Sequence, residues 1–193
     1  MSNTATEKAK AWLDANPKYK KVCMVLDIHL SQFYTGSTKW RKDATVKLVF
    51  GMNQSKGRVS VTPNKNNVRI RFAPLNSSKV VNEEFINIAL GELPSDCVIR
   101  VKEVDNVFDY YIPINATDIQ PCLANIDKIL DRFEFDGFRA PSAKCSTDIW
   151  SDNADAKIIR RKLSEFTSVV LREQEMERRF VNWLKASKGI HAR

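Results

Sequence analysis

Histidine and closely spaced cysteine are scarce in this chain of 193 residues. It has two histidines, His29 and His191, and its four cysteines stand far apart at positions 23, 97, 122 and 145. Zinc sites are normally marked by close pairs of ligands, and the sequence has no such pair. A chain of this length buries its own core without a disulfide framework. We therefore expect buried, reduced thiols, no metal and no cofactor.

Long apolar runs are missing as well. No stretch approaches the ~18–20 consecutive apolar residues that a membrane-spanning helix needs. Residues 1–8 lack the charged and apolar regions of a secretory signal. We expect a cytoplasmic chain with no membrane partner.

Motifs of the common catalytic sites are absent. The sequence has no phosphate-binding loop of the G-x-x-x-x-G-K-[ST] or G-x-G-x-x-G type and no G-x-S-x-G turn. The acid-x-Lys pattern of metal-dependent nucleases occurs at Asp155-Ala156-Lys157, where a helix is predicted to begin and the helix dipole explains the acid. The acidic cluster of Asp131, Glu134 and Asp136 has arginines beside it, which is typical of a solvated loop. We expect no catalytic residue, and no enzymatic activity in this chain.

Charge is distributed unevenly along the chain, whose net value is +8. Residues 1–80 have a balance of +11, residues 81–153 a balance of −8, and residues 154–193 a balance of +5. A basic first half followed by an acidic middle indicates one face that meets a polyanion.

The spacing of apolar residues predicts an α+β fold with an antiparallel, barrel-like mixed sheet flanked by helices. A short helix is expected before Pro17, and others at 82–90 and 118–130. Strands are expected at 22–29, 45–50, 58–62, 68–72, 97–102 and 107–112, with turn-rich links between several of them.

The end of the sequence has a different character. Neither Gly nor Pro occurs between Asp155 and Ser187, and apolar residues recur at helical spacing from Ile159 to Leu184. This pattern predicts a long C-terminal helical segment, as one helix or two. We expect a basic α+β domain at 1–140, a linker at 141–153 and a helical connector at 154–193.

Two basic clusters are candidates for contact with nucleic acid. Lys39, Trp40, Arg41 and Lys42 are expected in a loop, where the ring stacks on a base while the cations meet phosphates. Packing of the ring on the sheet edge is the alternative for Trp40. The second cluster comprises Arg58 and the region from the turn into the next strand, which contains Asn64, Lys65, Asn66, Asn67, Arg69 and Arg71.

Arg69 and Arg71 point to the same side of their strand, because side chains alternate, and this side is opposite Val68, Ile70 and Phe72. Arginine reads guanine and asparagine reads adenine in the major groove. An ordinary solvated face is the alternative for this second cluster.

A pocket for an extruded base is a further candidate. Asp109, Tyr110 and Tyr111 lie together on a predicted strand, and with Trp40 they would supply aromatic walls and an acceptor for a cytosine amino group. Neighbouring strand residues face opposite ways, so only one of the two tyrosines can line such a pocket. Ordinary packing is the alternative.

Residues 177–189, ERRFVNWLKASKG, resemble a helical segment of multidomain restriction endonucleases. The resemblance implies that the chain is an N-terminal DNA-recognition (specificity) domain joined to a nuclease domain of the same parent protein. The basic α+β layout before it is similar to two kinds of specificity domain, the PUA-like readers of methylated cytosine and the B3-like domains.

We therefore expect binding to duplex DNA, with recognition of methylated cytosine by base flipping as the first hypothesis. Sequence-specific reading in the B3-like manner is the alternative. Two further alternatives are an RNA-binding module and an assembly module that dimerises through the C-terminal helix.

Overall fold

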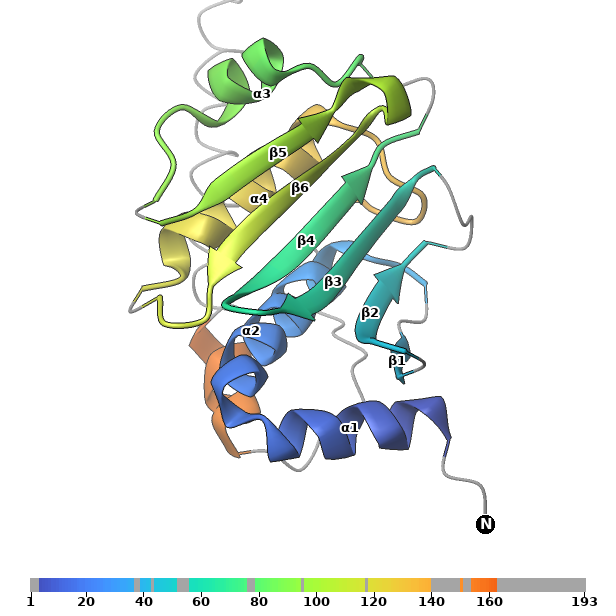
Figure 1. The fold of residues 1–193 in the computed structure, drawn as a ribbon, viewed down its shortest axis with the longest axis vertical. Helices are drawn as coiled ribbons and strands as arrows, with labels where there is room; N and C mark the ends of the chain where they lie inside the picture. Colours follow the sequence, from blue (N-terminus) through green and yellow to red (C-terminus); the bar gives the residue numbers. More distant parts are fainter. Residues whose placement is uncertain are drawn as a thin grey trace, which may run out of the picture.

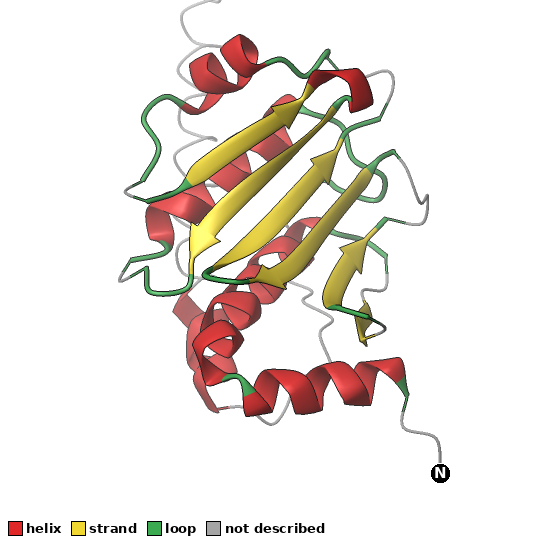
Figure 2. Cartoon of the chain, viewed as in Figure 1, coloured by secondary structure: helices red, strands yellow, loops and turns green. Residues whose placement is uncertain are grey.

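The computed structural model describes residues 4–36, 39–42, 44–51, 56–75, 79–94, 96–116, 118–139, 150 and 154–162. These residues form a six-stranded sheet with helices against one of its faces (Figures 1 and 2). The helices are α1 (Ala5–Ala15), α2 (Pro17–Phe33), α3 (Glu83–Leu90) and α4 (Gln120–Arg132), with a 3-10 turn, η1 (Glu103–Asp105). The strands are β1 (Lys39–Lys42), β2 (Val46–Phe50), β3 (Arg58–Asn64), β4 (Asn67–Ala73), β5 (Val98–Lys102) and β6 (Val107–Pro113). Residues 154–162 are also helical.

The sheet is open and antiparallel throughout. Its strands lie in the order β1-β2-β3-β4-β6-β5, so β1 and β5 are its two edges. The predicted α+β class is confirmed, whereas a barrel-like sheet is not. The strands expected between 45 and 112, and the helices expected at 82–90 and 118–130, are present with ends within two residues of the predicted ones.

The strand expected at 22–29 is wrong, because these residues belong to α2. Pro17 begins this helix, at the first-turn position where proline is tolerated. Every residue from Val22 to Gln32 is buried, so α2 has no solvent-exposed stripe in that part. A short apolar run with no polar stripe does not distinguish a buried strand from a buried helix.

The core lies between the sheet and the helices behind it. α2 lies behind β3 and β4, and α4 lies behind β5 and β6 in the view of Figure 1. Alternate residues of the central strands point toward these helices and are buried, among them Val59, Val61, Val68, Ile70, Phe72, Phe108, Tyr110 and Ile112. α1 packs against the edge strand β1.

Residues after α4 pack on the same core. Phe133 and Phe135 are buried, and so are Trp150 and Ala156, which belong to the expected linker and connector. The division of the chain at 140 and 153 stays a prediction. Most of the expected C-terminal helical segment, from residue 163 onward, lies outside the described residues.

The second face of the sheet carries no helix within the described part of the chain (Figure 2). This face is turned toward the viewer in the figures, and it bears the candidate site.

Candidate nucleic-acid interface

The uncovered face of the sheet carries basic and small polar side chains. On β4, Val68, Ile70 and Phe72 are buried against the helices, so Arg69 and Arg71 point to the other side, as the alternation predicts. The same alternation turns side chains of the other strands to this side. We call this set the basic face; it comprises Arg41, Lys47, Arg58, Ser60, Thr62, Arg69, Arg71, Arg100 and Lys102.

Strand register brings these side chains side by side. Arg41 lies opposite Lys47 across β1 and β2. Arg71 lies opposite Ser60 on β3 and opposite Asp109 on β6. Side chains that are directly opposite each other begin about 5 Å apart. Positive charges from neighbouring strands therefore share one surface.

The charges of the basic face act on one another at Lys47. Burial lowers the pKa of Lys47, and the nearby charges of Arg58, Arg69, Arg71 and Arg41 lower it further. The pKa of Arg58 is also lowered, by burial and by Arg41. A cation whose neighbours disfavour its charge is stabilised by an added anion. The basic face therefore favours phosphate groups.

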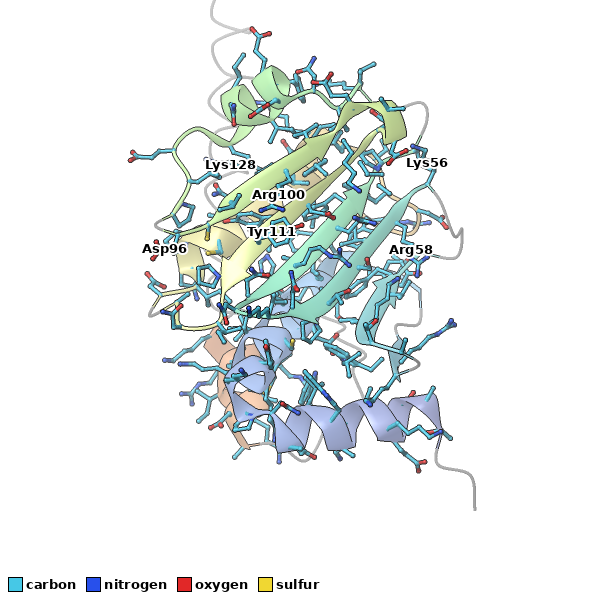
Figure 3. The ribbon with its side chains drawn as sticks, viewed as in Figure 1. Lys56, Arg58, Asp96, Arg100, Tyr111 and Lys128 are labelled. Carbon is cyan, nitrogen blue, oxygen red and sulfur yellow. The ribbon has the colours of Figure 1, made fainter. Side chains whose placement is uncertain are left out.

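Two contacts orient the middle of the face. Arg71 donates from Nε and Nη2 to the two carboxylate oxygens of Asp109, at 2.7 and 2.8 Å. This hydrogen bonding, opposed by partial burial, raises the pKa of Arg71. On the neighbouring strand the guanidinium of Arg100 lies 5.3 Å from the ring centroid of Tyr111 (Figure 3).

A hollow of about 520 Å³ opens at one end of the basic face. It lies where β3 and β6 begin and β4 ends. Its size is within the ~300–1,000 Å³ of common small-molecule sites. Its lining comprises Lys47, Lys56, Arg58, Ser60, Arg71, Ala73, Val104, Asp105 and Val107.

The predicted asparagine cluster lies at the opposite end of the face, in the turn between β3 and β4. Asn64, Lys65 and Asn66 are exposed. Tyr19 of α2 donates its hydroxyl to the Lys65 carbonyl at 2.7 Å, and the Ile114 N–H donates to the Asn66 carbonyl at 3.2 Å. The fold thus anchors the backbone of this turn while its side chains face solvent.

The prediction that Trp40 is an exposed loop residue is wrong. Trp40 lies in β1 and is only 2% exposed. Its Nε1 donates to Oδ2 of Asp27 at 2.6 Å, and its ring packs edge-on against Trp150. In this position the ring cannot stack on a base unless the edge of the sheet opens.

The other residues of the first cluster are also in β1 rather than in a loop. Arg41 is exposed and belongs to the basic face, and Lys42 is half-buried. The backbone of Lys39 pairs with Val49, while its side chain lies outside the described residues.

The four residues proposed for a modified-base pocket do not converge. Three strands separate the strand of Trp40 from that of the other three residues. Tyr110 is fully buried on the helix side, whereas Asp109 and Tyr111 point to the basic face. Asp109 is 3% exposed and paired with Arg71. These side chains therefore form no common pocket.

Lys47, Lys56, Arg100 and Lys102 belong to the candidate site and were not predicted. The sequence contained a signal for Lys47, because Val46, Leu48 and Phe50 alternate and so turn Lys47 to the opposite side. Lys56 becomes part of the hollow only because a distant hairpin reaches it. That contact has no local sequence signal.

Other reactive groups are paired inside the core. Nε2 of His29 lies 2.6 Å from Oδ1 of Asp127, and the sulfur atoms of Cys97 and Cys122 lie 3.5 Å apart. Among the described residues, no group of three or more His, Cys, Asp or Glu side chains is placed to hold a metal ion. No described helix is long and apolar enough to cross a membrane.

The segment that resembles restriction endonucleases, residues 177–189, lies outside the described residues. Comparisons with protein-family models, with curated proteins and with solved structures found no match.

Proposed function

We propose that this chain binds duplex DNA through the basic face. The observation that carries the proposal is the gathering of basic side chains from β1 to β4 on one uncovered face of the sheet. Lys47 lies among four arginines there, and its pKa is lowered by burial and by these charges. Cations held this close repel one another, and a bound polyanion replaces this repulsion with attraction. Phosphate contacts supply most of the sequence-independent affinity for DNA.

The dimensions of the face suit a duplex. Five strand spacings separate β1 from β5, which is roughly 24 Å at the usual distance between strands. A duplex carries one phosphate per ~1.7 Å of its axis, so several phosphates reach the face at once.

The basic face is less suited to binding single-stranded nucleic acid than to binding a duplex. Proteins that bind single-stranded nucleic acid stack its bases on aromatic side chains. Tyr111 is the aromatic residue that the described strands turn to this side, and Arg100 lies over its ring. Phosphate contact therefore outweighs base stacking here.

Base reading is proposed for the turn between β3 and β4. Asn64 and Asn66 are exposed on a turn with an anchored backbone, and asparagine pairs with adenine in the major groove. Such reading is of the B3-like kind. Such a face would serve the recognition domain of a restriction endonuclease, the context that residues 177–189 suggest.

The test is a fluorescence-anisotropy titration of a short labelled duplex between ~50 and ~200 mM salt. The double variant Lys47→Gln/Arg69→Gln should bind at least about tenfold more weakly, and its dependence of log K on log salt should be shallower by about two. Arg132→Gln/Lys157→Gln is the matched control, because it removes two exposed charges from α4 and from the 154–162 helix. Equal losses in both double variants, or no binding by the unaltered chain, would overturn the proposal.

Further ligands separate the alternatives in the same assay. Tighter binding to single-stranded RNA than to the duplex would favour an RNA-binding module. Tighter binding to a duplex with methylated cytosine would support recognition of a modified base. The pocket would then consist of residues other than the four that the sequence predicted for it. A concentration-dependent dimer that binds no nucleic acid would favour an assembly module.

A further inference from the structure

The hollow at the end of the basic face is closed on one side. Lys56, just before β3, donates from Nζ to the backbone carbonyl of Asp105 at the tip of the β5–β6 hairpin. Both residues line the hollow. Figure 3 shows Lys56 and Arg58 at the same end of the sheet. A strand of nucleic acid that follows the basic face into the hollow therefore meets this contact at its far side.

The fold holds the backbone on both sides of this contact. Asn106, in the left-handed region at φ 52°, donates its N–H to the Glu103 carbonyl and accepts the Val81 N–H through Oδ1 at 2.7 Å. On the other side, the Asp136 N–H donates to the Gly57 carbonyl at 2.8 Å. The shape of the hollow is therefore set by contacts with two other parts of the chain.

The lining of the hollow combines cations, a hydroxyl group and a small apolar surface. Lys47, Lys56 and Arg58 contribute positive charge. These cations outnumber the one acidic residue of the lining, Asp105. Ser60 contributes a hydroxyl group. The apolar part comprises Ala73, Val104 and Val107. This lining suits a phosphate with an attached sugar or base.

We propose that the hollow binds the terminal phosphate of a DNA strand. The contact between Lys56 and Asp105 bridges the far side of the hollow, so a strand end can stop in front of it. A terminal phosphate monoester carries a charge of about −1.5 to −2, more than one internal diester, so the cations of the hollow favour it further. This inference rests on the proposed function, because the strand reaches the hollow along the basic face.

The first test needs only the unaltered chain. Its affinity is measured for a covalently closed circular duplex and for linear duplexes whose ends carry a 5′-phosphate, a 3′-phosphate or only hydroxyl groups. One kind of phosphorylated end should bind about tenfold more tightly than the hydroxyl end, the effect of a charge-assisted hydrogen bond. Equal affinity for all the linear duplexes would overturn the inference.

Two variants then locate the effect. Lys56→Gln should abolish the preference for the phosphorylated end, and Arg58→Lys, which keeps the charge but loses the forked donor, should reduce it. Arg132→Gln on α4 is the control and should keep the preference. Persistence of the full preference in both hollow variants would place the effect elsewhere and overturn the inference. Circular dichroism and thermal melting check that each variant is folded.

A free nucleotide is the other source of the same chemistry. Thymidine 5′-monophosphate in excess should remove the preference for phosphorylated ends and leave binding to the closed circle unchanged. Failure to remove it would contradict the assignment of the hollow. A third outcome is that free thymidine 5′-monophosphate binds to the chain while all the linear duplexes bind with equal affinity. In that case the hollow is a nucleotide site and the inference about strand ends is wrong.

The closed circle distinguishes failure of this inference from failure of the proposed function. Salt-dependent binding to the circle, with no discrimination between linear ends, overturns only the role of the hollow. Loss of binding to the circle and to all the linear duplexes overturns the proposed function itself.

Discussion

Nε1 of Trp40 donates a hydrogen bond to Oδ2 of Asp27 over 2.6 Å inside the core. The same oxygen accepts Nε1 of Trp150 at 2.7 Å, and Ser31 donates to Oδ1 at 3.2 Å. Asp27 therefore joins α2, the edge strand β1 and the segment before the 154–162 helix. Burial raises the pKa of Asp27 to about 6, although its hydrogen bonds and Arg160 act in the opposite direction.

We predict that Asp27 makes the stability depend on pH in a distinctive way. The folded chain holds this proton more tightly than the unfolded chain, whose usual pKa is 3.8, so the free energy of unfolding falls as the pH rises from about 4 to about 6. The two pKa values correspond to at most about 3 kcal/mol.

Urea unfolding of the unaltered chain and of Asp27→Asn, between pH 4 and 7, measures this effect. The difference in unfolding free energy, unaltered chain minus variant, should decrease with rising pH. Because all other groups titrate in both proteins, a constant difference would contradict the assignment.

Trp40→Phe should destabilise the fold without weakening DNA binding. The variant removes one donor from the buried Asp27 carboxylate, which costs about 1–3 kcal/mol, and the ring is too deeply buried to touch DNA. Trp12→Phe is the matched control, because Trp12 packs on Tyr19 away from Asp27. Weaker binding by a Trp40→Phe variant of unchanged stability would restore a role for this ring in stacking on a base.

Asp109→Asn should change stability and binding in opposite directions. It loses the two-pronged charged pair with Arg71, at a cost of about 1–3 kcal/mol. It also removes a negative charge from the basic face, so duplex affinity should rise at low salt. Asp131→Asn removes the same charge from the exposed surface of α4. A similar rise in affinity in both variants would show that net charge, rather than the basic face, governs binding.

Gly57→Ala should destabilise the fold more than Gly91→Ala. Both glycines have positive φ, 70° and 68°, and ψ at Gly91 is −140°, so alanine is strained by about 1–3 kcal/mol at either position. A Cβ at Gly57 would lie 2.8 Å from Leu75 Cδ2 and 2.9 Å from Asp136 Cβ, whereas a Cβ at Gly91 would meet nothing within 4 Å. Urea unfolding should therefore show a loss for Gly57→Ala that exceeds the loss for Gly91→Ala by about 1–2 kcal/mol. Equal losses would show that the contacts around Gly57 yield easily.

Alternation in a strand is a local property, and it correctly predicted the side of the sheet to which two arginines point. Val68, Ile70 and Phe72 are apolar at every second position, so Arg69 and Arg71 had to point away from the core. The same argument applies to Lys47 on β2. The segregation of basic charge in the first half of the sequence likewise anticipated a surface that collects cations, because β1 to β4 all belong to that half.

Only the tertiary structure decided which apolar segments become buried and what they contact. From Val22 to Gln32, α2 is buried on all sides, so this part of the sequence has no amphipathic period, and a helix was mistaken for a strand. Trp40 lies inside because Asp27 and Trp150, distant in sequence, supply and share its hydrogen bond. Lys56 and Asp105 line one hollow because the segment before β3 meets the distant β5–β6 hairpin. Local periodicity determines the direction in which a side chain points, whereas partners far apart in the sequence determine what it meets there.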